Sequence, residues 1–452
     1  MTEGTTAILA TWCAEAPRDW SAACRDGARR AILDTLAVML AGQSESGVQA
    51  VRRGVSAWGA GRCFVVGAPV GLTAPAAALV NGTAAHAIDY DDVLNPSMSH
   101  PSAALVPALL ALAEATGAGP VQVIDAYLVG FEVMARLGEA MNLEHYRRGW
   151  HTTLSLGSPG VAAACGRLLG LDARRMAMTL SLSTSMAGGS KRQFGTVAKP
   201  LHAGLAAKNG MVAAQLAAAG VEGIAEPFEG KWGYLELMAG ETAPGFAGLA
   251  GRLGAPPAME QHGVWLKAYP CCASTHRPVD AVRRLRATLG EITRVEALVS
   301  EVAAANLRYR VPSTPSEARF SLPYCLAAAL KDGTLNMRSF TEAAIARSST
   351  TALIERIEMR VDPELRGDRP VSEATERATL LVSLANGTRL REVREVPHGH
   401  PGDPLSEEEL GAKFLDCARD ALPPRGAVAA LEQLQRFEKL NRIEEVTTLL
   451  RA

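Results

Sequence analysis

Residues 81–101 read NGTAAHAIDYDDVLNPSMSHP, and they place three carboxylates and two imidazoles between two Ala-rich segments that have the composition of buried helices. An Ala-rich interior holds little water to solvate a carboxylate. Such groups therefore pair with each other and with distant cations, or they line a polar pocket. The titratable side chains of this stretch include Asp89, Asp91, Asp92, His86 and His100. The matching cations must come from other parts of the chain.

The segments on both sides of this stretch are predicted to be helices closed by glycines. Residues 28–43 have apolar residues at helical spacing, and Gly42 is expected to end that helix in a left-handed conformation. Residues 102–116 predict a helix with Ser102 as its N-cap and Gly117 at its end. Further helices, rich in Ala and Gly, are expected at residues 121–141, 159–169, 173–186 and 203–219. Small residues let helix backbones approach closely, so these segments predict one large all-helical domain.

The pattern changes after about residue 263, where apolar and polar residues begin to alternate with period two. Residues 378–384 and 388–396 are joined by Asn386 and Gly387, the strongest short signal for a β-hairpin. Two more strands are expected at residues 295–302 and 354–361.

These patterns predict two domains in a mainly α fold. Residues 1–262 form the helical domain, and residues 263–402 form a smaller α+β lid domain with an antiparallel sheet. From Ser406 the text SEEEL is a capping box, and the chain returns to helix as far as Leu449. Residues 403–452 are therefore expected to complete the helical domain, which makes the α+β part an insertion.

The bulk composition argues against several classes of partner. The 452 residues include 46 Lys and Arg against 47 Asp and Glu, a net charge of -1, with no run of one sign long enough to bind nucleic acid or an anionic membrane. The N-terminal residues lack the basic start and apolar core of a signal peptide, and no apolar stretch approaches the length of a membrane span. We therefore expect a cytoplasmic protein with no nucleic-acid or membrane partner. The eight cysteines are scattered, and Cys271 and Cys272 are adjacent and not spaced as CxxC, so neither a zinc site nor a disulfide framework is expected.

The acidic residues of the 81–101 stretch can also be interpreted without a catalytic role. Asp89, Asp91 and Asp92 can cap helices or form ion pairs in a loop. A magnesium site of the DDxxD kind is another reading, but the residues after Asp92 leave that motif incomplete and no second acidic helix motif follows. A metal site is therefore disfavoured. The sequence also lacks GxGxxG, Walker A and GxSxG motifs, which argues against hydride transfer, phosphoryl transfer and serine hydrolysis.

Candidate cations lie at the starts of predicted helices and at the domain boundary. His100 and His151 each directly precede a helix, and AKPLHAGLAAKNG places Lys199 and His202 at the start of another. Each residue alone has a structural reading, as a cap, a core histidine or a lysine that extends its amine to solvent. Together with an acid, they suit a substrate with two or three carboxylates, since lysines and helix N-termini hold charge while a histidine moves a proton at carbon. At the domain boundary, LKAYPCCASTH adds Lys267 and His276.

Many of these residues stand in motifs that follow one another in a fixed order: VNGTAAHAIDYDD, HPSAALVPALLALAEA, GWHTT, TVAKPLHAGLAAKNG, KAYPCCASTH, ARFSLPY and PLSEEELGAKF. Through these motifs the chain resembles the MmgE/PrpD family, which includes 2-methylcitrate dehydratase, cis-aconitate decarboxylase and iminodisuccinate epimerase. The resemblance implies a homodimer of two-domain subunits, with the active site between the helical domain and the α+β lid. It also implies that the reaction needs no cofactor and no metal.

The resemblance also assigns site residues. The implied catalytic residues are Asp89, His100, His151, Lys199, Lys267 and Tyr324. Further substrate contacts are expected at Lys191, Arg192, His202 and His276. In this scheme the catalytic lysines hold carboxylates, the histidines at 100 and 151 donate and accept a proton, and Asp89 sets the tautomer and basicity of a histidine.

The sequence leaves the branch of the family open. Val93 stands where cis-aconitate decarboxylases resembling this chain carry a threonine, and the DxNDT and WGHPSD text of 2-methylcitrate dehydratases is absent. GWHTT, the FGT at residues 194–196 and CCASTH are closest to the iminodisuccinate epimerase branch. We expect a cofactor-independent lyase that dehydrates or decarboxylates a small di- or tricarboxylate by proton transfer α to a carboxylate. An epimerase of an iminodisuccinate-like dicarboxylate and a non-catalytic polycarboxylate-binding protein are the alternatives.

Overall fold

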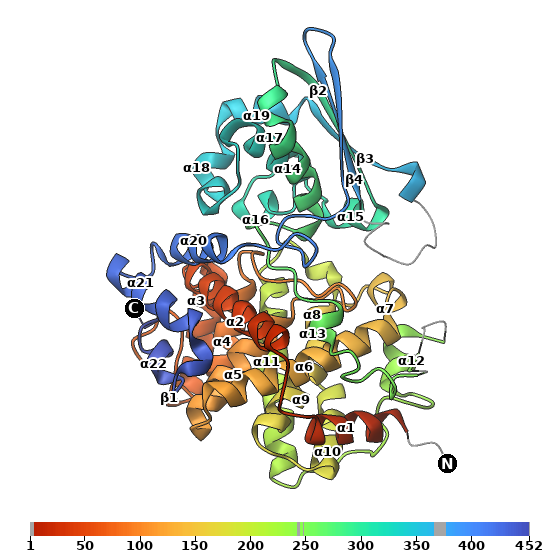
Figure 1. Ribbon diagram of the computed structural model, residues 1–452, viewed down its shortest axis with the longest axis vertical. Helices are drawn as coiled ribbons and strands as arrows, with labels where there is room; N and C mark the ends of the chain where they lie inside the picture. Colours follow the sequence, from red (N-terminus) through yellow and green to blue (C-terminus); the bar gives the residue numbers. More distant parts are fainter. Residues whose placement is uncertain (1–3, 242–244, 247, 366–376, 452) are drawn as a thin grey trace. The chain divides into compact units, whose positions relative to one another are not determined.

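Residues 4–241, 245–246, 248–365 and 377–451 are described in the computed structural model, and helices predominate among them (Figure 1). Their contacts divide the chain into two compact units. The first comprises Met1–Ala87, Asp91–Trp265 and Glu407–Ala452, and the second comprises Ile88–Tyr90 and Leu266–Ser406. The first unit is almost entirely helical and the second is α+β, which confirms the predicted fold class. The sequence patterns alone place the main boundaries at 262/263 and 402/403.

The core of the first unit consists of long helices that contact one another. They are α4 (Ala74–His86), α5 (Pro101–Thr116), α6 (Pro120–Met141), α9 (Gly157–Leu168) and α11 (Ala198–Ala218). Most residues of α5 and α6 are buried, as expected from segments that are apolar on nearly all sides. Around this core lie α1 (Thr5–Glu15), α2 (Ala22–Gly42), α3 (Ser46–Val55) and α10 (Ala173–Thr184). In the described part of the chain, no helix combines the length and apolarity needed to cross a bilayer.

Glycines allow α4 and α11 to cross in direct backbone contact. A Cβ atom added to Gly82 would lie 2.8 Å from the Cα of Gly204, and one added to Gly204 would lie 2.2 Å from the carbonyl oxygen of Leu79. Neither separation is possible between non-bonded atoms in a packed core. The crossing therefore fixes the C-terminal end of α4, where His86 lies, against the N-terminal half of α11.

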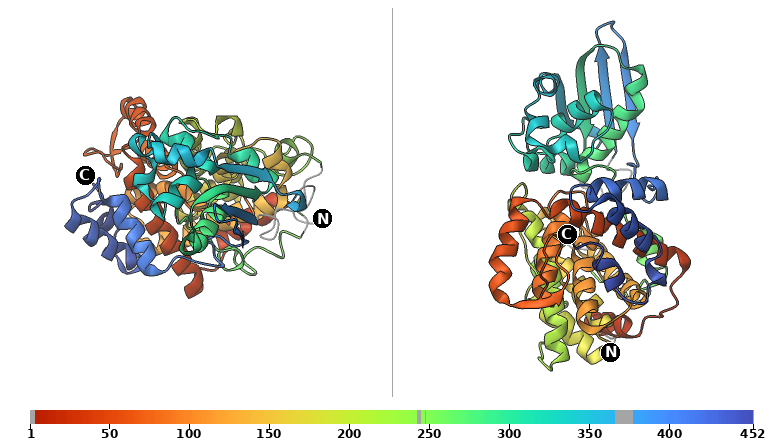
Figure 2. Two further views of the ribbon diagram at one scale, coloured as in Figure 1. Left: turned by 90° about the horizontal axis from the view of Figure 1, so that it is seen from above. Right: turned by 90° about the vertical axis from the view of Figure 1, so that its left-hand side faces the viewer.

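The C-terminal helices belong to the first unit (Figures 1 and 2). α20 (Glu407–Ala418) and α21 (Pro424–Gln435) contact α2, and α22 (Glu444–Thr447) follows them. The Lys413 Nζ atom lies 2.6 Å from Asp34 Oδ1, and both side chains are almost excluded from solvent. A buried ion pair thus joins α20 to α2.

Two helix ends differ from the sequence expectation. The N-cap of α5 is His100 and not Ser102, because Pro101 occupies the first helical position, where its missing N–H is not needed. Gly42 is the last residue of α2 but is not left-handed. Its small size matters instead, since a Cβ atom there would lie 2.1 Å from the carbonyl oxygen of Ala84. Gly117 ends α5 as predicted, and it does so in a left-handed conformation.

The second unit is built on a four-stranded sheet in the order β3–β2–β4–β5. The strands are β2 (Ile292–Val299), β3 (Ile357–Val361), β4 (Ala378–Leu384) and β5 (Arg389–Arg394). β4 and β5 form the predicted hairpin, in which Gly387 has a φ of +84°. β3 pairs with β2 in parallel, which corrects the expectation of an antiparallel sheet. The chain between these two strands holds several helices and is long enough for the crossover that a parallel pair requires.

Alternate residues of the sheet face the core of the second unit. Val295, Ala297 and Val299 are buried, and Val295 lies opposite the buried Val382. α14 (Ala273–Leu285) and α17 (Leu322–Asp332) contact each other and the sheet, and Figure 1 shows them on one side of it. The crossover contains α15 (Glu301–Asn306), α16 (Pro315–Ala318), α18 (Glu342–Ile345) and α19 (Ser348–Ile354).

Candidate active site

The acidic stretch forms the connection between α4 and α5, and it is buried despite its charge. Asp91 is 0% exposed and Asp92 is 1% exposed. Backbone bridges pair Leu94 with Ser99 and Val93 with Trp265, so the loop has a defined shape. Carboxylates buried in this way require nearby donors.

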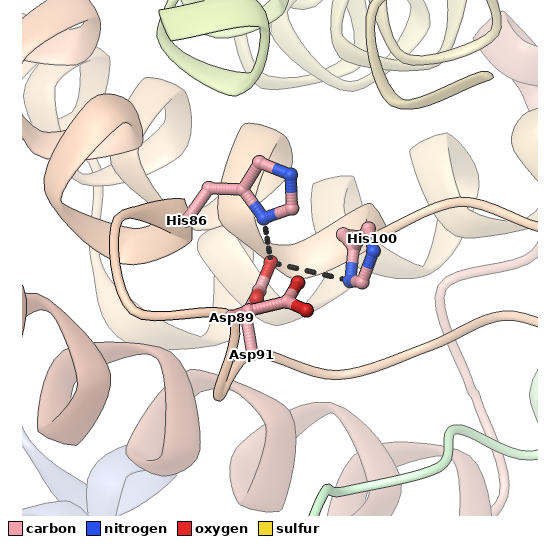
Figure 3. A group of neighbouring side chains, drawn as sticks. All are labelled: His86, Asp89, Asp91 and His100. Atoms are coloured by element: carbon pink, nitrogen blue, oxygen red, sulfur yellow. Dashed lines mark hydrogen bonds and ion pairs between the residues drawn. The ribbon is translucent and has the colours of Figure 1, made fainter. Parts of the chain in front are cut away.

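Asp91 lies between two imidazoles (Figure 3). Its Oδ2 atom is 2.7 Å from His86 Nδ1 and 3.4 Å from His100 Nδ1. A carboxylate in this position stabilises a positive charge on either ring. The sequence pattern does not distinguish Asp91 from its acidic neighbours or His86 from a core histidine, so neither is among the predicted site residues. The only signal available is that His86 lies near the end of a helix, five residues before an acid.

His100 also contacts the backbone of the loop. Its Nδ1 atom is 2.8 Å from the carbonyl oxygen of Asp92. A carbonyl oxygen can only accept, so Nδ1 carries a proton and Nε2 is the nitrogen that can exchange one. The side chain is 14% exposed, in contrast to the fully buried Asp91. His100 is therefore the member of this group that solvent or a substrate reaches most easily.

Asp92 supports the start of α5. Its carboxyl group accepts the backbone N–H of Ser102 at 3.2 Å and also accepts the Ser102 hydroxyl. Burial raises the pKa of Asp92 to about 8; the Ser102 hydrogen bonds oppose this rise and the charge of Asp91 adds to it. The Asp92 side chain is thus mainly protonated at neutral pH, while its carbonyl oxygen holds His100.

Two further histidines lie close to this group. His151 precedes α8 (Thr152–Ser155), and its Nδ1 atom is 2.9 Å from Nδ1 of His202, in the first turns of α11. The ring centroids of His86 and His151 are 5.6 Å apart, and those of His86 and His100 are 4.5 Å apart. The structure therefore gathers His100, His151 and His202 from three segments, and places the unpredicted His86 among them.

Lys199 lies in the first turn of α11 and is almost completely buried. Its Nζ atom is 5.4 Å from the centroid of the Phe194 ring, and the edge of that ring meets His151 at a centroid distance of 5.0 Å. The positive charge of Lys199 acts on His151 and His202, and together with the N-terminus of α11 it forms a cationic environment suited to bind a carboxylate.

The expected contacts at Lys191 and Arg192 lie in the short helix η2 (Lys191–Gln193). Lys191 Nζ is 3.3 Å from the centroid of the Tyr146 ring and 3.4 Å from the Tyr146 carbonyl oxygen. Arg192 is exposed. Lys191 is therefore engaged by Tyr146 in this structure, and substrate contact by either residue stays a prediction.

Lys267 and Asp89 meet within the second unit. Lys267 Nζ donates a hydrogen bond to the carbonyl oxygen of Asp89 at 2.8 Å and lies 3.3 Å from its carboxylate. Asp89 has a φ of +55°, a left-handed conformation that Asp tolerates better than most residues. Asp91 makes the contacts to both imidazoles described above, and the role expected for Asp89, to orient a histidine, stays a prediction.

Tyr324 and His276 are fully buried in the second unit. The Tyr324 hydroxyl donates a hydrogen bond to the carbonyl oxygen of Ser339, and His276 Nε2 lies 3.3 Å from the carbonyl oxygen of Cys271. These contacts stabilise the core of that unit. A catalytic role for Tyr324 and a substrate contact at His276 stay predictions.

The donor set of Figure 3 also matches a metal site. Single atoms of His86, Asp89, Asp91 and His100 lie within 4.8 Å of one another, and such ligands suit a divalent transition metal. However, Nδ1 of each imidazole faces the Asp91 carboxylate, and Nδ1 of His100 also donates to a carbonyl oxygen. A metal would displace these hydrogen bonds and remove the Nδ1 proton of His100. The arrangement therefore fits hydrogen-bonded imidazoles better than metal ligands.

The sequence model of the MmgE/PrpD N-terminal domain matches residues 7–247, and that of the MmgE/PrpD C-terminal domain matches residues 269–439. The chain belongs to the MmgE/PrpD family. The resemblance expected from the ordered motifs is thereby confirmed, and the motifs of this MmgE/PrpD protein carry the histidines and the Lys199 side chain of the first unit.

Relatives of this MmgE/PrpD protein include cis-aconitate decarboxylases from animals and a fungus. The Homo sapiens enzyme is 31% identical over 392 residues, which cover 83% of this chain and 79% of the relative. The Mus musculus enzyme is 29% identical over 390 residues, with 83% and 78% covered. The enzyme of Aspergillus terreus (strain NIH 2624 / FGSC A1156) is 27% identical over 485 residues, with 99% and 95% covered. The MmgE/PrpD family and these relatives support a lyase-type enzyme that acts on a small molecule.

Proposed function

We propose that this MmgE/PrpD protein is a cofactor-independent lyase that dehydrates or decarboxylates a small di- or tricarboxylate, in the manner of a cis-aconitate decarboxylase. The observation that carries the proposal is the buried Asp91 carboxylate between His86 and His100. Imidazoles held by a carboxylate in a site of low solvent access are suited to proton transfer at carbon. The relatives, which are cis-aconitate decarboxylases, support the same class of substrate.

The proposed decarboxylation needs a proton donor and a place for negative charge. The bond from carbon to one carboxylate breaks, CO2 leaves, and the electron pair remains on a carbon conjugated with another carboxylate. His100 gives a proton from Nε2 to carbon, and Asp91 stabilises the imidazolium before the transfer. Lys199 holds a remaining carboxylate and its developing charge. Lys267 has an indirect role: it donates a hydrogen bond to the backbone carbonyl of Asp89 and so holds Asp89 in position.

An epimerase of an iminodisuccinate-like dicarboxylate is the second candidate. Epimerisation requires one group that removes a proton from carbon and another that returns a proton to the opposite face. His100 and His151 supply two such groups, because both rings lie next to His86. The GWHTT and FGT motifs favour the same branch.

We also propose a homodimer in the cytoplasm. The homodimer is what the family resemblance implies. Leu216 in the last turn of α11 and Val197 at its N-cap are both exposed. Exposed apolar residues of this kind are common in protein interfaces. All eight cysteines are buried as thiols, which suits a reducing compartment.

Proton NMR in deuterium oxide tests the proposed function. The protein is incubated separately with cis-aconitate, citrate, 2-methylcitrate and iminodisuccinate, and an Asp91→Asn variant serves as the inactive control. Loss of a carboxylate or of water from one of the tricarboxylates supports the lyase. Deuterium exchange at iminodisuccinate without loss of a group supports the epimerase. Thermal stabilisation by a polycarboxylate without any reaction would overturn both and leave a binding protein.

A further inference from the structure

Apart from the group around Asp91, the first unit holds a second pair of histidines. The Nδ1 atoms of His151 and His202 are 2.9 Å apart. Two imidazole nitrogens at this distance form a hydrogen bond only when one of them carries a proton and the other does not. The two rings therefore share a single proton between their Nδ1 atoms.

The surroundings of this pair differ from those of His100. The groups that act on His151 are His86, Lys199, His202 and His100, all neutral or cationic, and its ring also meets the edge of Phe194. Burial and these neighbours lower the pKa of His151 well below its ordinary value, and burial with His86 and Lys199 lowers the pKa of His202 to about 4. The pair is thus uncharged at neutral pH, whereas His100 faces the Asp91 carboxylate. Different surroundings of this kind suit one histidine to accept a proton and the other to donate one.

The Nε2 atom of His151 is the ring nitrogen that can bind a ligand. The residue is 2% exposed, and its Nε2 atom has no hydrogen-bond partner among the described residues. A buried N–H without an acceptor destabilises the folded protein. A lone pair on Nε2 needs no acceptor, and the positive charge of Lys199, which acts on this ring, favours it over an N–H. His151 therefore donates from Nδ1 to His202 and keeps a lone pair on Nε2.

We infer that His202 is a positioning residue that accepts the Nδ1 proton of His151 and thereby makes Nε2 of His151 the nitrogen that takes a proton from the substrate. In this step a C–H bond α to a carboxylate breaks, its electron pair stays on the substrate and its proton moves to Nε2. The Nδ1–H of the resulting His151 imidazolium stays hydrogen-bonded to Nδ1 of His202, which holds the charged ring in place.

This assignment replaces the direct substrate contact that the sequence suggests for His202. It deepens the proposed function and rests on it, because an acceptor at His151 and a donor at His100 together serve dehydration and epimerisation, whereas decarboxylation needs only the donor. The protonation state of His151, however, can be measured without turnover.

Nitrogen NMR of protein labelled with ¹⁵N-histidine tests the inference, with His151→Gln used to assign the signals. We expect His151 to be protonated at Nδ1 and unprotonated at Nε2. His202→Leu removes the acceptor and shifts His151 toward the Nε2-protonated tautomer. His202→Asn, whose amide reaches the place of Nδ1, retains the wild-type tautomer. His262→Leu is the control, since His262 pairs with Glu139 at 2.8 Å and does not face His151.

Kinetics with the accepted polycarboxylate give the second readout. For His202→Leu we expect kcat/KM to fall at least about tenfold with little change in KM, and the acid limb of its pH profile to move to lower pH, because protonated His151 has lost its acceptor. His202→Asn should stay within about threefold of wild type.

Two results would overturn the inference. One is a wild-type His151 protonated at Nε2, and the other is a His202→Leu variant with reduced turnover but an unchanged His151 tautomer, which would make His202 a substrate contact. If no polycarboxylate reacts, the proposed function fails, while the tautomer of His151 still decides the role of His202. If His202→Leu does not fold, the wild-type and His202→Asn spectra decide it.

Discussion

At the scale of single residues, three acids within four positions have three different environments. Asp91 shares its charge between two imidazoles, Asp92 is mainly protonated at neutral pH, and Asp89 binds Lys267. Their places in one loop do not reveal this division, because the side chains point toward different surroundings. The environment of each carboxylate therefore decides its role.

Replacing Asp91 by Asn should remove most of the activity. The amide is the same size but carries no charge, so it cannot stabilise an imidazolium at His86 or His100. We expect kcat/KM to fall by about 100-fold or more, measured with whichever polycarboxylate reacts. Asp416→Asn is the control, because Asp416 forms an ion pair with Arg419, just past the end of α20, and α20 carries none of the site histidines. Equal activity of the two variants would remove Asp91 from the mechanism.

Asp92 should make stability depend on pH. Its carboxyl has a pKa near 3.8 when unperturbed and about 8 in the folded protein. Between these values the folded state holds one more proton than the unfolded state, so the free energy of unfolding falls as pH rises from about 4 to about 8.

The Asp92→Asn variant should lack this contribution. Relative to wild type, its free energy of unfolding should rise by roughly 2–5 kcal/mol between pH 5 and pH 9, since each pKa unit corresponds to about 1.4 kcal/mol. Urea unfolding at the two pH values measures the difference. If the free energy of unfolding changed with pH in the same way in wild type and in Asp92→Asn, the pKa of Asp92 could not be raised.

At the scale of elements, the histidines come together where helix ends meet. His86 ends α4, His100 precedes α5, and His202 lies near the start of α11. The backbone crossing at Gly82 and Gly204 sets the distance between two of these ends. The site therefore depends on a contact between helices and not only on its own side chains.

A methyl group at Gly204 should loosen this contact. Gly204→Ala forces its Cβ atom against the carbonyl oxygen of Leu79, so α4 and α11 must separate. We expect a loss of about 2 kcal/mol or more in the free energy of unfolding, together with reduced turnover. Gly54→Ala is the matched control, because Gly54 is also helical but has nothing within 4 Å of an added Cβ atom. That variant should be as stable as wild type or slightly more stable, by about 0.5–1 kcal/mol.

At the scale of the whole molecule, the buried pair of Asp34 and Lys413 links segments far apart in the sequence within the first unit. Lys413→Met should cost about 3 kcal/mol or more, because it leaves the Asp34 carboxylate buried without its ammonium partner. Adding Asp34→Asn should recover much of the loss, as both charges are then gone.

Chemical unfolding of the two variants measures this effect. Arg174→Met is the matched control, because Arg174 and Glu222 form a similarly close pair at 2.6 Å on the exposed surface. It should change stability by less than about 1 kcal/mol. A Lys413→Met variant as stable as this control would show that the buried pair does not hold α20 to α2.

Local patterns suffice to predict much of the fold. The helical segments, the stop at Gly117 and the Asn386–Gly387 hairpin all depend on residues close together in the chain. The parallel pairing of β3 with β2 depends on partners about sixty residues apart, and no local pattern reports it. The partners His86 and Asp91 are only five residues apart, but their pairing depends on the conformation of the loop after α4, which spacing alone does not predict. The order of the motifs identifies the family, but it does not show which carboxylate of the acidic cluster forms the ion pair with a histidine.

The burial of every thiol has a practical consequence. Cys271, Cys272 and Cys325 lie in the second unit, and the other five cysteines lie in the first. A thiol-specific reagent should therefore react slowly with the native protein and rapidly with whichever unit opens. Mass spectrometry of the labelled peptides would reveal the order in which the two units unfold, with the natural cysteines as reporters and without any engineered label.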